Sequence, residues 1–338
     1  MQSTVKPSFI VWIFTSICNL NCKHCYAWRL KGLKELDLRE KLSLIRDLAE
    51  ISVNYVNLTG GEPLIHPHLT CILKELHGYG IMTSIVTNAT RVSEEIARLL
   101  SKHYVYTYVS IDGPKEIHDM IRGLGSYDQA IKGVNTLRAH GIPFSIVMAV
   151  NRLNYGFVGE VVDLAVKLGA ERLALIPVMP SGKALSNELY VRREEYLRAL
   201  KIADEKADEL GYNISLWCTP FAPLVIKSKY ISYYYCRTYD VVDIDPSGRL
   251  LACDVIDLAI SSIKLNGFKK AWETYINNNI IRELVNPKKL PGNCSNCSLR
   301  QICKGGCFAR SYLVYRKLNA GDPLCPRVGH LKTSTANT

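Results

Sequence analysis

Three cysteines stand within eight positions near the start of the chain, at Cys18, Cys22 and Cys25 in CNLNCKHCY. A structural zinc ion normally takes four protein ligands and a disulfide takes two thiols, so three thiols form an incomplete ligand set. The C-x3-C-x2-C spacing can hold three corners of a four-iron cluster and leave the fourth iron free for a substrate or cofactor. The alternative is a zinc site completed by His24, although zinc sites usually separate two ligand pairs by a longer loop.

A second group of seven cysteines follows residue 230: Cys236, Cys253, Cys294, Cys297, Cys303, Cys307 and Cys325. Their spacing is C-x11-G-x4-C, where the glycine is Gly248, then C-x2-C-x5-C-x3-C and a last cysteine. Seven thiols exceed the four ligands of one tetrahedral site, so they indicate at least two metal centres. A two-zinc knuckle is the alternative. Cys71 lies in a helical pattern, which predicts a core position.

A glycine pair occurs in LTGGEPL, directly after a β-branched run. Gly60 and Gly61 would let the backbone come close to a ligand, and Glu62 places a charged acceptor at the end of the predicted strand. Taken alone, the stretch is also compatible with a tight turn between a strand and a helix.

The elements that must position these residues alternate over roughly the first 180 residues. Predicted strands are FIVWIFTS, VNYVNLTG, MTSIVTN, YVYTYVSI, PFSIVMAVN and RLALIPVM, and amphipathic helices include SEEIARLLSK, YDQAIKGVNTLRAH and GFVGEVVDLAVKLG. Six strand–helix repeats predict a parallel sheet, either an open doubly wound sheet or a partial barrel. In both folds ligands bind at the carboxyl ends of the strands, which is where the first cysteine loop lies.

The pattern changes after a long charged helix, VRREEYLRALKIADEKADELG, which ends with Gly211 at its C-cap. YDVVDIDPSGRLLACDV then predicts a β-hairpin that turns at residues 245–248, and loops rich in Gly, Pro and Cys follow. We therefore expect a barrel over 1–190, a linking helix over 191–211, a small cysteine-rich domain over 212–330 and a frayed tail over 331–338.

Composition limits the compartment and the partners. No secretory signal opens the chain and no apolar run reaches the roughly 18 residues of a membrane span, so we expect a cytoplasmic protein that uses its 12 cysteines for metal binding. The net charge of +11 is uneven: residues 1–211 carry 25 basic against 23 acidic side chains, and residues 212–338 carry 17 against 8. Deprotonated thiols at a metal centre would offset part of this excess, so nucleic acid is not the expected partner.

The combination of CNLNCKHCY with GGEP after the next strand resembles the radical SAM enzymes. The resemblance implies that Cys18, Cys22 and Cys25 hold a 4Fe-4S cluster whose fourth iron binds S-adenosylmethionine (SAM), within a partial (β/α)6 barrel of the TIM type. It assigns SAM contacts to Tyr26 against the adenine, to Gly60, Gly61, Glu62 and Pro63, to Thr87 and Asn88 in VTNAT, to Ser110 and Asp112 in VSIDGP, and to Arg122 and Asn151.

Three of these positions have structural alternatives. Asn88 would only cap a strand end, Arg122 would be a surface arginine paired with Asp119, and Asn151 would be a turn residue.

The second cysteine group closely resembles the SPASM extension of radical SAM peptide and protein maturases, which carries auxiliary 4Fe-4S clusters. The resemblance assigns Cys294, Cys297, Cys303 and Cys325 to a distal cluster, and Cys236, Cys253 and Cys307 to one nearer the active site. The nearer cluster then lacks one ligand. Cys218 is the candidate, with a free buried cysteine or an open site as the alternatives.

The resemblance also implies a reaction. The first cluster receives an electron from a donor such as ferredoxin or flavodoxin and cleaves SAM to a 5'-deoxyadenosyl radical, which removes hydrogen from a peptide or protein side chain. Asp254 matches an aspartate that takes a proton from the substrate in anaerobic sulfatase-maturating enzymes. The alternative is an aspartate that lies at the surface or only supports the neighbouring ligand cysteine. Only about eight residues precede the first strand, so we expect no leader-binding domain before the barrel.

Two other functions remain open. Haem-pathway radical SAM decarboxylases share similar cysteine patterns, and a basic C-terminal half would suit porphyrin carboxylates. A multi-cluster electron carrier without SAM chemistry is the third reading, but it has no use for GGEP or for an open three-cysteine site.

Overall fold

The computed structural model describes residues 6–329, so the predicted tail at 331–338 lies outside the described residues. One sheet runs through it, in the order β11-β10-β9-β1-β2-β3-β4-β5-β6-β7-β8. The strands are β1 (Phe9–Thr15), β2 (Tyr55–Gly60), β3 (Met82–Thr87), β4 (Tyr106–Ser110), β5 (Phe144–Val150), β6 (Leu173–Pro177), β7 (Ile214–Leu216), β8 (Ile231–Tyr233), β9 (Val241–Ile244), β10 (Arg249–Leu251) and β11 (Ala259–Ser262).

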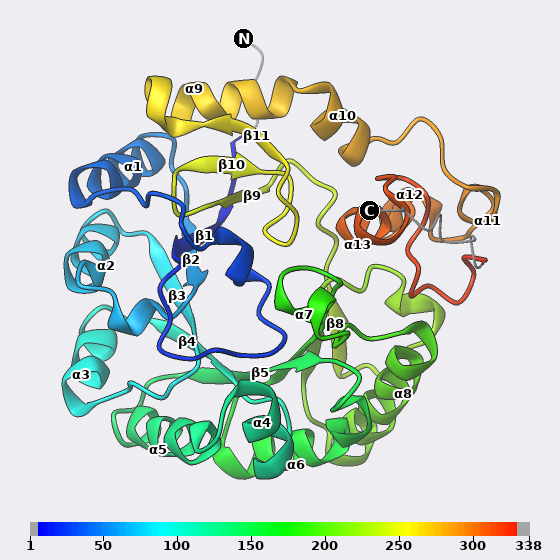
Figure 1. The fold of residues 1–338 in the computed structure, drawn as a ribbon, viewed down its shortest axis with the longest axis horizontal. Coiled ribbons are helices and arrows are strands. Elements are labelled where there is room, and N and C mark those ends of the chain that lie inside the picture. Colours follow the sequence, from blue (N-terminus) through cyan, green and yellow to red (C-terminus); the bar gives the residue numbers. More distant parts are fainter. Residues whose placement is uncertain (1–5, 330–338) are drawn as a thin grey trace.

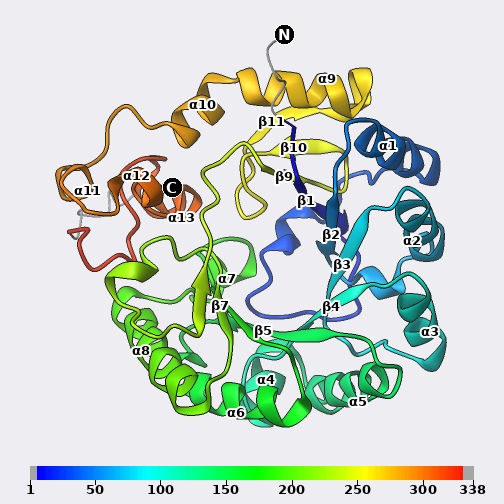
Figure 2. The ribbon, with the colours of Figure 1, turned by 180° about the vertical axis from the view of Figure 1, so that it is seen from behind.

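Helices cover the outside of this curved sheet (Figures 1 and 2). In chain order, the helices of residues 6–329 are α1 (Leu38–Glu50), α2 (Leu69–Gly78), α3 (Glu94–Lys102), α4 (Lys115–Arg122), α5 (Ser126–Ala139), α6 (Val158–Leu168), α7 (Lys183–Ser186), α8 (Arg193–Leu210), α9 (Ile263–Asn277), α10 (Asn279–Val285), α11 (Gly292–Ser295), α12 (Arg300–Cys303) and α13 (Phe308–Tyr315). Short 3-10 turns are η1 (Ala27–Leu30), η2 (Pro63–Ile65), η3 (Tyr155–Phe157) and η4 (Ala222–Leu224).

The predicted α/β class and partial barrel are confirmed. All six predicted strands form and pair in parallel from β1 to β6, because runs rich in β-branched residues are buried on both faces of such a sheet. Two short strands, β7 and β8, extend the parallel sheet beyond the prediction. The long helix is α8, and Gly211 caps it in the left-handed conformation, as expected.

The predicted hairpin is also present, but it belongs to the same sheet. β9 and β10 are antiparallel, and β9 pairs in parallel with β1, so the first strand of the chain has a neighbour from the C-terminal half. The Asp245 carboxylate closes the turn by accepting hydrogen bonds from the Ser247 and Arg249 amides. Where the cysteine-rich domain begins remains a prediction.

The loop after β1 crosses the middle of the ring at the carboxyl ends of the strands, and α11 to α13 lie at one side of the ring (Figure 1). Arg193 at the start of α8 donates a hydrogen bond from Nε to the Pro323 carbonyl at 2.9 Å, which ties that side to the barrel. None of the helices within residues 6–329 combines the length and the apolar composition that a membrane-spanning segment requires.

One expectation about the core is wrong. Cys71 is exposed, because α2 buries Leu69, Ile72, Leu73 and Leu76 and turns Cys71 to the opposite face. The predicted helix forms, but Cys71 lies on its exposed face and not on the face that packs into the core.

Candidate active site at the mouth of the barrel

The first three cysteines lie together in the loop that follows β1. The charge of Cys25 acts on both Cys18 and Cys22, and the charge of Cys18 acts on Cys22, so the three lie close together. Burial, the largest effect, raises the pKa of the Cys22 thiol to about 11. The loop is held by its own backbone, since the Cys25 amide donates to the Cys22 carbonyl at 3.3 Å. His24 lies beside a carboxylate instead: its Nε2 is 3.5 Å from Asp112.

The glycine pair packs against this loop. The Gly61 amide donates to the Thr15 carbonyl at 2.7 Å, and the Glu62 amide donates to the Ile17 carbonyl at 2.8 Å. A Cβ atom on Gly60 would lie 2.3 Å from the Thr15 carbonyl oxygen, and one on Gly61 would lie 2.0 Å from that of Ile17. The close approach that requires both glycines is therefore between two segments of the protein, one of which carries the first cysteines.

Glu62 organises the ends of β2 and β3. Its fully buried carboxylate accepts hydrogen bonds from the Leu64 amide at 3.0 Å, the Thr87 hydroxyl at 2.8 Å and the Asn88 amide at 2.7 Å. Burial outweighs these bonds and raises the pKa of Glu62 to about 7. The Asn88 side chain continues the network to Asn19, 3.1 Å away in the cysteine loop, so Asn88 does more than cap a strand.

Asp112 and Arg122 form a buried ion pair after β4. Arg122 Nε lies 2.6 Å from Asp112 Oδ2, and the Ala149 amide donates to Asp112 Oδ1 at 2.8 Å. Burial raises the pKa of Asp112, but the charge of Arg122 and the other neighbours outweigh it and the net shift is downward. Arg122 is therefore not a surface arginine paired with Asp119, which accepts from the Gly125 and Tyr127 amides.

Two further predicted positions lie nearby. Ser110 ends β4 and is buried. Asn151 is buried after β5, where its side chain accepts from the Leu153 amide at 2.9 Å and donates to the Ala149 carbonyl at 3.0 Å. These bonds are those of a turn residue.

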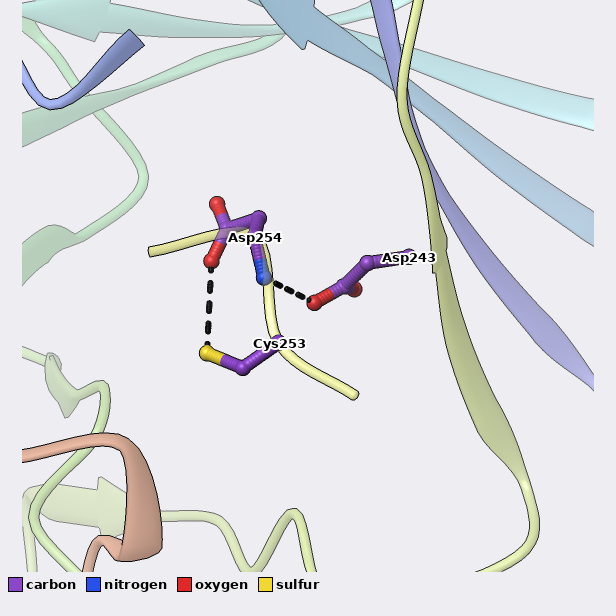
Figure 3. A group of neighbouring side chains, drawn as sticks. All are labelled: Asp243, Cys253 and Asp254. Atoms are coloured by element: carbon purple, nitrogen blue, oxygen red, sulfur yellow. Dashed lines mark hydrogen bonds between the residues drawn. The ribbon is translucent and has the colours of Figure 1, made fainter. Parts of the chain in front are cut away.

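Asp254 lies against the first cysteine loop. The Tyr26 hydroxyl donates a hydrogen bond to the Asp254 carboxylate and accepts one from Thr59. The Asp254 amide donates to Asp243 Oδ2 at 2.6 Å, and the Cys253 thiol lies 3.6 Å from Asp254 Oδ1 (Figure 3). Burial raises the pKa of both aspartates. The structure thus brings Asp254, from the loop between β10 and β11, to Tyr26, which directly follows Cys25.

Eight of the remaining nine cysteines form two groups, and Cys71 on α2 belongs to neither. In the first, the charge of Cys307 acts on Cys218, Cys236 and Cys253, which therefore lie around it. In the second, Cys294, Cys297, Cys303 and Cys325 line one small cavity together with Asp322. Burial and, second, the charge of Asp322 raise the pKa of the Cys303 thiol to about 12. Cys218, which we named as the candidate for the missing ligand of the nearer cluster, thus lies in the first group.

The donor sets fit iron-sulfur clusters. All 12 cysteines are free, and three of them converge in the first loop while two groups of four converge in the C-terminal half. Thiols are the ligands that such clusters take, and three ligands leave one iron open.

Several supporting residues were not found from the sequence. Glu35 accepts hydrogen bonds from the Thr15 and Ser16 hydroxyls and the Ser16 amide, and it lies 3.8 Å from the buried Lys41 ammonium and 3.6 Å from His66. It thereby supports both the cysteine loop and the segment after GGEP. No spacing marks this network, or Asp243, because its members come from separate elements.

Comparison of the sequence with known families and proteins gives three findings. The family model described as Radical SAM superfamily matches residues 12–165. The chain is 30% identical over 341 residues to mycofactocin maturase MftC of Mycobacterium tuberculosis (strain CDC 1551 / Oshkosh), covering 98% of this chain and 85% of that protein. It is 27% identical over 343 residues to the AdoMet-dependent heme synthase of Methanosarcina barkeri, covering 95% of this chain and 97% of that protein.

Among solved structures, the fold is similar to that of Streptococcus suis SuiB bound to its precursor peptide SuiA. The TM-score is 0.78 with 17% sequence identity, over 95% of this chain and 76% of that one.

Proposed function

This chain belongs to the radical SAM superfamily, and we propose that it modifies a side chain of a peptide or protein by oxidation or crosslinking. It is a radical SAM enzyme, with SAM and 4Fe-4S clusters as cofactors and auxiliary clusters in a C-terminal region of the SPASM type. The observation that carries the proposed substrate class is the 30% identity to a maturase over almost the whole chain.

In this proposal Cys18, Cys22 and Cys25 hold the SAM-binding cluster. Glu62 and Asn88 fix the segment that would receive SAM against the cysteine loop, and the Arg122–Asp112 pair fixes the ends of β4 and α4. When bound, the cluster and SAM together supply one-electron chemistry that removes a hydrogen atom from an unactivated carbon.

Asp254 would accept the proton that the substrate loses when its product is more oxidised. Its carboxylate is oriented by the Tyr26 hydroxyl, and its backbone is held by Asp243. The electron released at the same time would pass to the auxiliary clusters held by the two C-terminal cysteine groups. An external donor such as ferredoxin or flavodoxin would reduce the first cluster.

Formation of 5'-deoxyadenosine tests the enzyme class. Anaerobically reconstituted protein is mixed with dithionite and SAM, with Cys18→Ala/Cys22→Ala/Cys25→Ala as the control. We expect the nucleoside from the wild type only. Candidate peptides are then added, and a mass change in the peptide supports the proposed substrate class, whereas nucleoside formation with no change in any peptide argues against it.

A haem-pathway reaction is the second candidate, because the Methanosarcina barkeri relative matches 97% of its own length. An excess of basic side chains in residues 212–338, 17 against 8 acidic, suits a porphyrin carboxylate. Optical titration with a porphyrin separates the two: tight binding favours this candidate, and absence of binding favours the peptide.

A further inference from the structure

A buried ion pair, Arg310–Asp322, lies between the two C-terminal cysteine groups. Arg310 Nε is 3.0 Å from Asp322 Oδ1, and Nη2 is 3.2 Å from Oδ2. The residues are 2% and 0% exposed. Removing two charged groups from water costs free energy, so a buried pair at this place calls for a functional explanation.

The arginine end faces the first group. Arg310 Nη2 donates to the Cys218 carbonyl at 2.6 Å, and the Arg310 amide lies 3.5 Å from Cys307 Sγ. Arg310 Nη1 is buried and has no hydrogen-bond partner among residues 6–329. A buried guanidinium donor without a protein partner is expected to bind an acceptor that the chain itself does not supply.

The aspartate end faces the second group. Asp322 lines the cavity of Cys294, Cys297, Cys303 and Cys325, and its carbonyl accepts from the Cys325 amide at 3.0 Å. Its carboxylate also accepts from the Cys307 amide at 3.0 Å, so it joins the two groups. The negative charge of Asp322 acts on Cys294, Cys303 and Cys325. The positive charge of Arg310 acts on Cys218 and Cys307, and at Cys307 it is larger than the opposing charge of Asp322, which acts there too.

We propose that Arg310–Asp322 sets the order of the auxiliary reduction potentials, so that an electron shared by the two clusters resides on the one held by Cys218, Cys236, Cys253 and Cys307. Positive charge and hydrogen-bond donors near a cluster favour its reduced, more negative form, and negative charge disfavours it. One electron lost by the distal cluster is gained by the nearer one, and no other reactant is consumed. The inference rests on the proposed assignment of both groups as cluster ligands.

The same arrangement assigns positioning roles. Arg310 supplies charge and the free Nη1 donor, and Asp322 holds the arginine and the Cys307 and Cys325 amides. An electron that leaves through the distal cluster would therefore have to move to the cluster with the more negative reduction potential. An external acceptor would be needed to remove the electron from it.

A redox titration followed by electron paramagnetic resonance tests this on the full-length, anaerobically reconstituted protein. Cys253→Ala and Cys297→Ala assign the signals of the nearer and distal clusters. Arg310→Gln should move the midpoint of the nearer cluster to a more negative potential. The expected shift is at least the 59 mV that corresponds to a tenfold change in the ratio of oxidised to reduced cluster for a one-electron couple. Asp322→Asn should move the distal midpoint to a more positive potential.

Two controls accompany these variants. Arg193→Gln removes a positive charge next to Pro323 without touching a cysteine, and it should leave both auxiliary midpoints in place. The SAM-binding cluster is the control within each sample, because Arg310 and Asp322 are not among the main charges that act on Cys18 or Cys22. Iron content, about twelve atoms per chain for three four-iron clusters, verifies loading.

The inference is overturned if the midpoints of the fully loaded variants do not move. It is also overturned if both variants shift the midpoint of only one cluster, and in the same direction. If Arg310→Gln does not load iron, the midpoints of the wild type provide the test. The nearer cluster must then be reduced at a less negative potential than the distal cluster, and the reverse order overturns the inference. A wild type that loads only the SAM-binding cluster overturns the ligand assignment as well, which distinguishes that failure from failure of the ion pair's role.

Discussion

The Tyr26 hydroxyl donates a hydrogen bond to the Asp254 carboxylate. Tyr26 directly follows Cys25, and Asp254 directly follows Cys253, so this bond joins the loop of the first cysteines to that of the auxiliary group. A group that takes a proton from the substrate must lie within reach of the place where hydrogen is removed. The bond therefore places the proposed proton acceptor beside the proposed SAM site.

Asp254→Asn should separate SAM cleavage from product formation. The amide keeps the size of the side chain but cannot take the substrate's proton, so product formation should fall by about 10²- to 10⁴-fold. Nucleoside formation without product should persist, as quantified by chromatography. Asp257→Asn is the matched control, since the Asp257 side chain is 62% exposed. Equal product yields from Asp254→Asn and the wild type would exclude the proton-accepting role.

Gly61→Ala should displace the first cysteine loop. Its Cβ would meet the Ile17 carbonyl at 2.0 Å, which is backbone and cannot move aside alone. We expect a loss of about 1–3 kcal/mol in the free energy of unfolding and a lower iron content. Gly78→Ala, in α2, meets nothing within 4 Å and should leave both unchanged or slightly improve stability. Normal iron loading by Gly61→Ala would contradict this prediction.

Arg122→Gln should strongly destabilise the protein. It leaves the fully buried Asp112 carboxylate without its cation, and breaking such a pair costs about 3–5 kcal/mol. Denaturant unfolding under anaerobic conditions measures the loss. Asp112→Asn in the same background should restore part of the lost stability, because the uncompensated charge is then removed. A double variant less stable than Arg122→Gln would show that the pair is not the main source of the effect.

Cys71 should be the most reactive thiol in the iron-loaded protein. It is exposed on α2, outside all three cysteine groups, whereas the other 11 cysteines would be ligands. Brief iodoacetamide treatment followed by mass spectrometry should label Cys71 first. Cys71→Ser should abolish this label without changing iron content or nucleoside yield. A loss of iron in Cys71→Ser would assign it an unexpected ligand role.

Much of the barrel could be predicted because its signals are local. The runs that became β1 to β6 are dense in β-branched residues, and Gly211 ends α8 where the periodicity stops. The strands β7 and β8 were missed because three residues each are too short to show a pattern.

The candidate site, like the fold, could be predicted only where the sequence carries a local signal. Regular spacing marked most of the cysteines. Cys218 stands outside that spacing and could be named only as a candidate for the nearer group, because its place there depends on the fold bringing residue 218 to residue 307. Arg122 was compared with Asp119, its near neighbour in sequence, whereas its partner Asp112 lies across the end of β4. Arg310 and Asp322 carry no motif, and only burial reveals them.

The pairing of β9 with β1 also bears on how the protein is made. During synthesis β1 emerges first, but one of its two edges stays open until residues 241–244 have been added. Contacts between such distant parts of a chain form slowly and leave an unpaired strand edge exposed in the meantime. The cysteine loop that continues β1 therefore lacks part of its final support until most of the polypeptide has left the ribosome, and we expect the proposed first metal site to be completed late in the protein's maturation.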